Sequence, residues 1–238
     1  MEMRLDKLLA HYGLGTRKEV KKYIKKGDVK VNSQIIKKDD FKVDIDKDIV
    51  TFQDELIQYK PYVYIMLNKP AGYVSATRDL VHQTVVDLVE EYENYDLFPV
   101  GRLDKDTEGL VILTNDGDFA HKLLSPSRHH AKLYYAHIDG QVTDDDIQAF
   151  HEGIVIDDYR CFPANLTLIK NEDNQSEVYI EIYEGKFHQI KRMFQSVGKR
   201  VVYLKRLKIK SLELDDCLKL GEYRELSEHE LFDLMKDL

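Results

Sequence analysis

The sequence predicts an α+β protein in which a mixed, largely antiparallel sheet forms most of the larger of two domains. Candidate strands outnumber candidate helices and mix with them irregularly, unlike the regular alternation of parallel α/β folds. Residues 177–183 alternate apolar and polar side chains, as a half-buried strand does. The pattern breaks over residues 53–61, which we interpret as a linker. We therefore expect one domain over residues 1–60 and a second over residues 61–238.

The composition is that of a globular protein with a substantial core. Hydrophobic residues make up 43% of the 238 residues, and no apolar run approaches the roughly 20 residues of a membrane span. The N-terminus has no apolar signal region. Cys161 and Cys217 lie far apart and outside any metal-ligand spacing. We expect a cytoplasmic protein with no membrane contact and no structural zinc.

Positive charge is concentrated in two stretches, although the formal net charge is −8. Residues 1–38 hold eleven Lys and Arg against four Asp and Glu, and residues 186–210 hold nine Lys and Arg and no acid. Basic stretches on an acidic body are typical of proteins that bind a phosphate backbone over a limited area. Alternatively, the two basic stretches are solvated surfaces with no ligand.

The first domain is expected to contain two short helices and a hairpin. Apolar residues spaced three and four apart over residues 4–12 predict an amphipathic helix. Thr16 and Glu19 have the spacing of a capping box that opens a second helix, and Gly27 suits its left-handed end. Residues 29–36 then predict two short strands joined by a turn.

This arrangement, with one densely basic helix, resembles the ribosomal S4-like RNA-binding domain over about residues 3–52. One departure is Asn32-Ser33, where that family commonly has Asn-Gly, but asparagine tolerates the positive φ of such a turn. A generic small α/β domain is the alternative. The resemblance implies that the cations on the outer face of the second helix contact RNA. Six cations face out, Arg17, Lys18, Lys21, Lys22, Lys25 and Lys26, and the first five are the candidate RNA contacts.

The second domain is expected to open with a buried strand over residues 63–67, a turn over 68–72 and more strand over 73–75. Residues 84–92 predict a helix. The later predicted elements are a short helix beginning at Asp116, a strand over residues 132–139, a helix capped by Thr143, the strand over residues 177–183, a helix over residues 185–197, a strand over residues 201–214 and a last helix with a capping box at Ser227.

The most informative segment, residues 101–110, reads Gly-Arg-Leu-Asp-Lys-Asp-Thr-Glu-Gly-Leu between two apolar strands. It places a carboxylate, Asp104, at the mouth of a strand with Arg102 two residues before it. A carboxylate held in this way can attack or stabilise C1′ of a sugar, and the guanidinium can hold a phosphate.

Two other interpretations compete for this segment. Asp104, Asp106 and Glu108 have the spacing of calcium-loop ligands. Asn115, however, stands where such a loop needs a bidentate glutamate, and apolar strand residues precede it. Alternatively, Asp104 simply closes a turn, as aspartate often does.

Residues 101–110 resemble the catalytic loop of RsuA-type pseudouridine synthases, which modify ribosomal RNA. Three further segments resemble that family in the same order: residues 66–73, 132–134 and 184–194. With the S4-like domain, the resemblance covers nearly the whole chain. It implies a reaction that breaks the N1–C1′ bond of uridine and joins C5 of the uracil to C1′, in a pocket that excludes water.

The resemblance also implies roles for three residues. Asp104 is the catalytic carboxylate, either as the nucleophile at C1′ or as the base that takes the C2′ proton. Lys191 supplies the opposing charge, and Tyr134 stacks on the uracil and helps to move the C5 proton. Tyr135 must face the opposite way, because side chains alternate along a strand. Alternatively, Lys191 is a solvated surface lysine and Tyr134 is a core residue.

Several other residues are expected to contact the RNA rather than to react. Arg102 contacts a phosphate or fills the gap left when the uridine flips out of its stack, with an ion pair to Asp106 as the alternative. Neither His188 nor the pair His129-His130 has a third ligand at suitable spacing, so we expect no metal. The remaining candidates for RNA contact are His188, Arg192, Lys205 and Arg206.

We therefore expect a monomeric enzyme that needs no cofactor and isomerises a uridine of ribosomal RNA, most specifically 16S rRNA of the pre-ribosomal small subunit. One alternative is the same reaction on 23S rRNA. A second is a non-catalytic ribosome-binding or assembly factor, which would need the basic surfaces but not Asp104. A third is a glycoside or nucleoside hydrolase, which usually needs two carboxylates, with Asp106 as the candidate second acid.

Overall fold

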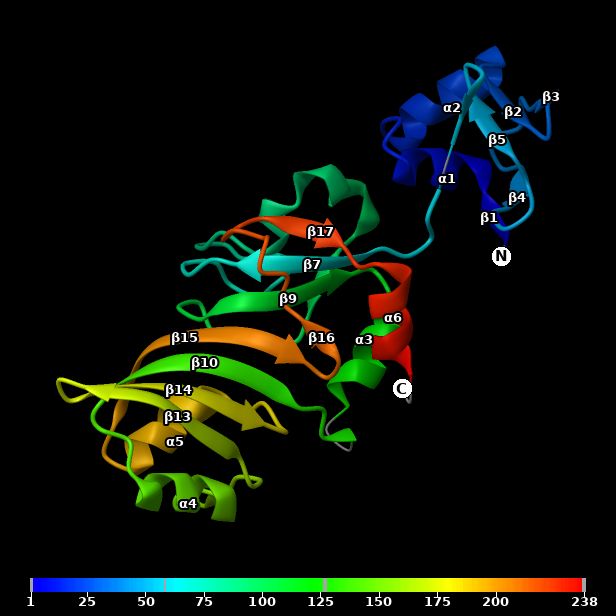
Figure 1. Cartoon of the computed structure of the whole chain (residues 1–238). Coiled ribbons are helices and arrows are strands. Elements are labelled where there is room, and N and C mark those ends of the chain that lie inside the picture. The colour runs from blue at the N-terminus through cyan, green and yellow to red at the C-terminus, as the bar shows by residue number, and fades with distance from the viewer. Residues whose placement is uncertain (1, 58, 126–127, 237–238) are drawn as a thin grey trace. The chain divides into compact units, whose positions relative to one another are not determined.

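The computed structural model describes residues 2–57, 59–125 and 128–236, and the chain divides into two compact units (Figure 1). The first unit comprises Met1–Tyr62 with Tyr92–Asp96, and the second comprises Val63–Glu91 with Leu97–Leu238. No helix within the described ranges is long and apolar enough to cross a membrane.

The first unit combines two helices with short strands. Its elements are β1 (Glu2–Arg4), α1 (Leu5–His11), α2 (Arg17–Lys26), β2 (Val29–Val31), β3 (Gln34–Ile35), β4 (Lys42–Asp44), β5 (Val50–Phe52) and β6 (Glu55–Leu56). β1 pairs with β4, and the other strands form a sheet in the order β3-β2-β5-β6. The apolar faces of α1 and α2 supply Leu8, Val20 and Ile24 to the core.

The predicted helix caps and hairpin turn of this unit are confirmed. Thr16 and Glu19 form the predicted capping box at the start of α2. Gly27 ends the helix in the left-handed conformation with φ of 91°. Asn32 and Ser33 have φ of 49° and 68°, which is the backbone of a tight hairpin turn.

The linker predicted over residues 53–61 is wrong in its first part. Gln53 and Asp54 form a hairpin turn with positive φ, and β6 pairs with β5. Ile57 is buried in the core of the first unit. Residue 58 lies outside the described residues. The pattern missed this hairpin because both residues of β6 are exposed, so no apolar alternation marks the strand.

A fully buried carboxylate, that of Asp6, joins the two helices of this unit. Asp6 accepts hydrogen bonds from Arg4 at 3.0 and 3.1 Å and from Arg17 at 2.8 Å, and Lys21 Nζ lies 3.8 Å away. Burial alone raises the pKa of Asp6, but the hydrogen bonds from Arg4 and Arg17 lower it more, so the net pKa lies below 3.8. The folded unit therefore favours the ionised carboxylate.

We expect Asp6→Asn to destabilise the first unit by about 2 kcal/mol, because it removes the charge that Arg4 and Arg17 neutralise. The stabilisation from Asp6 should be present above pH 3.8 and lost as the pH falls through the lower pKa of the folded state. Hydrogen exchange of the α1 and α2 amides in the full chain measures both effects. Asp39→Asn is the control, since its pair with Lys21 is partly exposed. Equal protection in the two variants would contradict the prediction.

The second unit is built around one large sheet, which confirms the predicted α+β class with a mixed, largely antiparallel sheet (Figure 1). The sheet order is β13-β14-β10-β15-β9-β7-β17, with β16 beside β15 and β8 beside β9. Only β15 and β9 pair in parallel among the strand pairs of the described residues. The strands are β7 (Tyr64–Lys69), β8 (Phe98–Val100), β9 (Glu108–Thr114), β10 (Lys132–Asp139), β13 (Asn165–Glu172), β14 (Gln175–Ile182), β15 (Arg200–Ile209), β16 (Leu212–Glu213) and β17 (Tyr223–Glu225).

Three helices of this unit begin where their caps predict. Asp116 caps α3 (Gly117–Leu124), and Thr143 and Ser227 form capping boxes at α4 (Asp144–Glu152) and α6 (Glu228–Met235). The fourth helix, α5 (Gln189–Ser196), buries Ile190 against the neighbouring structure and contacts β15. A two-stranded ribbon, β11 (Val155–Ile156) with β12 (Tyr159–Arg160), lies between α4 and β13 in the sequence.

Three predicted details of this unit are corrected, and one strand was not predicted. The α-helix predicted over residues 84–92 is wrong, since the segment holds two 3₁₀ helices, η1 (Val86–Leu88) and η2 (Glu90–Tyr95). Residues 73–75 form no strand beyond a single bridge from Val74. The helix predicted over residues 185–197 begins only at Gln189, after His188 in the left-handed conformation. β13 was missed because most of its side chains are exposed at the edge of the sheet.

Candidate active site

The loop that carries Asp104 is held at both sides by buried side chains. β8 and β9 pair in antiparallel fashion, so residues 101–107 connect neighbouring strands. Ser75 Oγ accepts a hydrogen bond from the Leu103 N–H at 3.1 Å and donates one to the Leu103 carbonyl at 3.0 Å. Both residues are buried. This double contact fixes the backbone immediately before Asp104.

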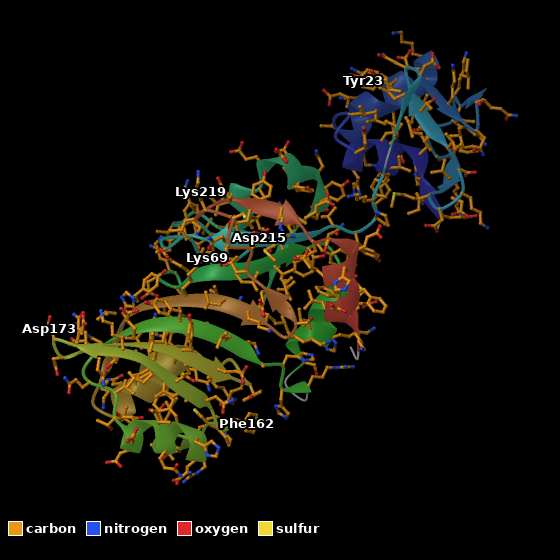
Figure 2. The ribbon with its side chains drawn as sticks, viewed as in Figure 1. Tyr23, Lys69, Phe162, Asp173, Asp215 and Lys219 are labelled. Atoms are coloured by element: carbon orange, nitrogen blue, oxygen red, sulfur yellow. The ribbon has the colours of Figure 1, made fainter. Side chains whose placement is uncertain are left out.

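Lys69 holds the other side of the loop. Its side chain is fully buried at the end of β7, next to β9 (Figure 2), and its ammonium donates to the carbonyls of Pro70, Lys105 and Thr107 at 3.1, 3.2 and 2.8 Å. Burial lowers the pKa of Lys69 to about 8. We did not assign Lys69 a role from the sequence. The signal in the sequence is a lysine at the end of an apolar strand, directly before a proline. A lysine at such a position is not expected to be solvent-exposed.

Asp104 forms an ion pair with Lys191, which lies 87 residues later in the chain. Lys191 Nζ lies 3.1 Å from Asp104 Oδ2 and 2.6 Å from Asp106 Oδ1. The Asp104 and Lys191 side chains are each 24% exposed, whereas that of Asp106 is 73% exposed. Asp104 therefore points neither into the core nor into bulk water, and the predicted pairing with Lys191 is present.

The two carboxylates raise the pKa of Lys191. Burial lowers the pKa of Lys191, but hydrogen bonds to Asp106 and Asp104 raise it more, so the net pKa lies above its ordinary value. Conversely, burial raises the pKa of Asp106 but the hydrogen bond from Lys191 lowers it more. Lys191 is therefore a permanent cation between two carboxylates near neutral pH.

α5 is placed by a buried amide. Gln189 donates to Glu184 Oε1 at 2.7 Å and accepts from the Lys186 N–H at 2.9 Å, which ties the loop before the helix to the helix itself. Ile190 is buried on the inner face. From the same helix, Lys191 Nζ reaches Asp104 and Asp106 of the loop.

Tyr134 lines the same cavity as the ion pair. The cavity has a volume of about 60 Å³, and Arg102, Asp104, Tyr134 and Lys191 all contribute to its wall. Tyr134 is 6% exposed on β10, and Tyr135 faces the opposite side, where its hydroxyl donates to Glu177 at 2.5 Å. The predicted alternation of the two tyrosines is confirmed.

Arg102 and His188 flank this cavity. Arg102 is exposed and forms no ion pair with any residue that the structure describes, so the alternative pairing with Asp106 is wrong. His188 Nε2 lies 3.7 Å from Asp104 Oδ1, and its ring stacks on Phe187 with centroids 3.8 Å apart. Both residues lie beside the carboxylate and present groups that suit an RNA strand.

The remaining candidates for RNA contact differ in exposure. Arg206 is 3% exposed and donates to the Leu110 carbonyl at 2.8 Å, so it lies in the interior of the second unit. Arg192 pairs with Asp157, and Lys205 is half-buried. In the first unit, Asp6 engages two of the predicted cations, Arg17 and Lys21. The exposed cations of α2 are Arg17, Lys18, Lys22, Lys25 and Lys26.

The calcium-loop alternative is not supported by the geometry. Asp104 and Asp106 both contact Lys191, while Glu108 accepts a hydrogen bond from the Tyr203 hydroxyl at 2.8 Å. Across the described ranges, no group of three or more His, Cys, Asp or Glu residues could hold a metal ion.

The fold and site together define a class of enzyme in which one carboxylate, paired with a lysine, lies beside a buried tyrosine at the centre of a mixed sheet. Comparison with known proteins identifies the family. The profile described as RNA pseudouridylate synthase matches residues 63–196, and the S4 domain profile matches residues 3–50. The chain belongs to the RNA pseudouridylate synthase family, and its N-terminal part is an S4 domain, as the resemblance implied.

Its relatives match over nearly their full lengths. An uncharacterized RNA pseudouridine synthase of Bacillus subtilis is 47% identical over 96% of this chain and 97% of its own. The ribosomal small subunit pseudouridine synthase A of Vibrio vulnificus is 37% identical over 98% of this chain and all of its own. A crystal structure of a pseudouridylate synthase has a TM-score of 0.67 at 36% identity and covers 98% of this chain and 99% of its own.

Proposed function

We propose that this RNA pseudouridine synthase isomerises one uridine of small-subunit (16S) ribosomal RNA. The observation that carries the proposal is the Asp104–Lys191 ion pair in a cavity that Tyr134 also lines. Relatives named ribosomal small subunit pseudouridine synthase A support the substrate, since the Vibrio vulnificus and Escherichia coli proteins are each 37% identical over almost the whole chain.

In the proposed reaction, Asp104 acts on the ribose. It either attacks C1′, which breaks the N1–C1′ bond, or removes the C2′ proton, which expels N1 from C1′. The free uracil then turns and its C5 bonds to C1′, with loss of the Asp104–C1′ bond in the first route and return of the C2′ proton in the second. The C5 proton is then lost and N1 gains a proton. Tyr134 supports the uracil by stacking, and Lys191 balances the charge of Asp104. The product has the same atoms as the substrate, so no cofactor is required.

We further propose a division of labour between residues 1–60, which bind RNA, and residues 61–238, which hold the catalytic site. The two profile matches and the two compact units support this division. Exposed cations of α2 then hold the phosphate backbone, since Lys18, Lys22 and Lys25 are exposed on the outer face. A monomer in the cytoplasm, acting on the pre-ribosomal small subunit, fits this role.

The alternatives make different predictions about the product. A hydrolase would release free uracil, but its candidate second acid, Asp106, is largely exposed and paired with Lys191. A non-catalytic factor would bind RNA and leave its uridines unchanged. An enzyme for 23S rRNA would modify the large-subunit RNA alone.

Mapping of pseudouridine in ribosomal RNA from cells with and without the protein tests the proposal. We expect one 16S position to lose its modification in the deletion strain and to regain it with purified protein in vitro. A change confined to 23S rRNA would overturn the proposed substrate. Unchanged RNA of both subunits, with no activity in vitro, would overturn the proposed function.

We expect Lys191→Met to lower kcat by roughly 100-fold, because two carboxylates then face the ribose without a counter-charge. The pKa of Asp106 should rise, since Lys191 is the group that holds it below its ordinary value. Single-turnover kinetics across pH measures both effects. Lys191→Arg, which keeps the charge, should retain more activity. Equal loss in both variants would show that charge is not what Lys191 contributes.

A further inference from the structure

A second, larger cavity adjoins the catalytic one. Its volume is about 320 Å³, within the range of roughly 300–1,000 Å³ that is typical of ligand sites. Arg102, Tyr134, Gly185 and Lys186 line both cavities, but Asp104 and Lys191 line only the first. The second cavity therefore has access to the catalytic tyrosine and none to the proposed reacting carboxylate.

The wall of this cavity holds cations that lack acidic partners. Arg206 is 3% exposed, and its Nη2 has no hydrogen-bond partner in the part of the chain that the structure describes. Lys132 Nζ donates to the His130 carbonyl at 2.9 Å and forms no ion pair within the same residues. Burial, and then the charge of Arg206, lowers the pKa of Lys132 to about 8. A buried guanidinium N–H without an acceptor costs stability unless a ligand supplies one.

Glu184, the acid in the wall of the same cavity, does not pair with these cations. Glu184 accepts hydrogen bonds from the Tyr159 hydroxyl at 2.6 Å, the Phe162 N–H at 3.0 Å and Gln189 at 2.7 Å. Its oxygens are thus already engaged by these three donors, although its charge still raises the pKa of Lys132 slightly against the effect of burial. The cavity consequently retains excess positive charge that an anion would neutralise.

The rest of the wall is partly aromatic and partly aliphatic, with Leu123, Leu124 and Ile209 among the aliphatic residues. Tyr134, Tyr159, Tyr183 and Phe162 line the cavity, and Lys186 Nζ lies 4.4 Å from the centre of the Tyr159 ring. Phe162, labelled in Figure 2, is 40% exposed. Aromatic faces stack well on nucleobases, and lysine and arginine bind phosphate. Together these walls match a nucleotide rather than an apolar ligand.

We propose that this cavity binds the nucleotide next to the target uridine, with its phosphate on Lys132 and Arg206 and its base against the aromatic wall. The proposal rests on the proposed function, because it assigns a subsite for the same RNA strand. Tyr134, shared by both cavities, then separates the reacting base from its neighbour. The cavity is a binding subsite that selects sequence or geometry beside the target and takes no part in bond breaking.

The test uses Lys132→Met in the full chain and an rRNA fragment in which wild-type protein forms pseudouridine. We expect KM to rise about tenfold, because a charged hydrogen bond to phosphate is lost. We also expect a thermal midpoint no lower than that of wild type, since a half-buried cation that forms no ion pair is removed. Lys170→Met, at an exposed lysine paired with Glu172, is the matched control and should leave KM unchanged.

To locate the phosphate that contacts Lys132, the phosphate on each side of the target uridine is replaced, one at a time, by a neutral methylphosphonate. One of them should raise KM about tenfold for wild-type protein and have little further effect on Lys132→Met. Arg206→Lys, which retains a donor for the Leu110 carbonyl, should show the same coupling. Free uridine monophosphate is a second probe: binding that depends on Lys132, without any effect of the neutral linkages, would overturn the RNA assignment.

Two results separate this inference from the proposed function. Pseudouridine formation by wild-type protein, with additive effects of Lys132→Met and every neutral linkage, would overturn the subsite and leave the enzyme function intact. No pseudouridine in any ribosomal RNA would overturn both.

Discussion

Asp104→Asn is expected to reduce pseudouridine formation by roughly 10³-fold or more while RNA affinity is largely retained. The substitution preserves the shape of the side chain but removes its ability to act as nucleophile or base. The fold should tolerate it, because Lys191 keeps its ion pair with Asp106 at 2.6 Å and Ser75 still holds Leu103. The loss therefore falls on chemistry rather than on stability.

The assay is release of the hydrogen bound to C5 of labelled uridine, alongside filter binding of the same RNA. Asp106→Asn is the matched control. It removes the other carboxylate on Lys191, but that carboxylate is 73% exposed, so we expect less than a tenfold loss. Activity of Asp104→Asn within tenfold of wild type would contradict the assignment of Asp104. A greater loss in Asp106→Asn would move the catalytic role to Asp106.

Gly109→Ala is expected to destabilise the second unit by about 3 kcal/mol or more. Gly109 has φ of +98°, which already costs an alanine roughly 1–2 kcal/mol. It also lies opposite Arg206 in the parallel pair of β9 and β15, where an added Cβ would lie 2.2 Å from the Arg206 carbonyl oxygen. That oxygen belongs to backbone and cannot turn aside, so the two strands would have to separate.

Gly72→Ala provides a matched control for backbone strain alone. Gly72 has φ of +97°, but an added Cβ would meet nothing within 4 Å. Urea denaturation of the two full-length variants should show a loss at Gly109 that exceeds the loss at Gly72 by about 2 kcal/mol. Because native domains are stable by roughly 5–15 kcal/mol, the Gly109 variant should also lose soluble yield. Equal midpoints for the two variants would contradict the close approach of β9 and β15.

Features governed by neighbouring residues could be predicted from the sequence. The capping boxes at Thr16, Thr143 and Ser227 need only a hydroxyl and an acid three residues later, and all three formed. The bounds of the strand over residues 132–139 were predicted as the structure has them. Such signals depend on backbone geometry within one turn or one strand.

Features governed by residues that are distant in the sequence could not be predicted. β13 carries mostly exposed side chains and is a strand only because β14 offers it an edge. Arg206 looked like a surface cation in a basic stretch, yet its register opposite Gly109 and Tyr134 turns it into the interior. Lys69 is buried because the loop after β8 presents three carbonyls to it.

By itself, the sequence determined the family, the α+β class and the identity of the candidate carboxylate, since residue types and spacing within short segments carry these. Only the tertiary structure decided which charges meet: Lys191 bridges Asp104 and Asp106, while Lys132 and Arg206 form no ion pair with the described residues. The physical reason is that hydrophobic periodicity fixes which face of a strand or helix is buried. The order and register of the strands in the sheet fix what that face touches.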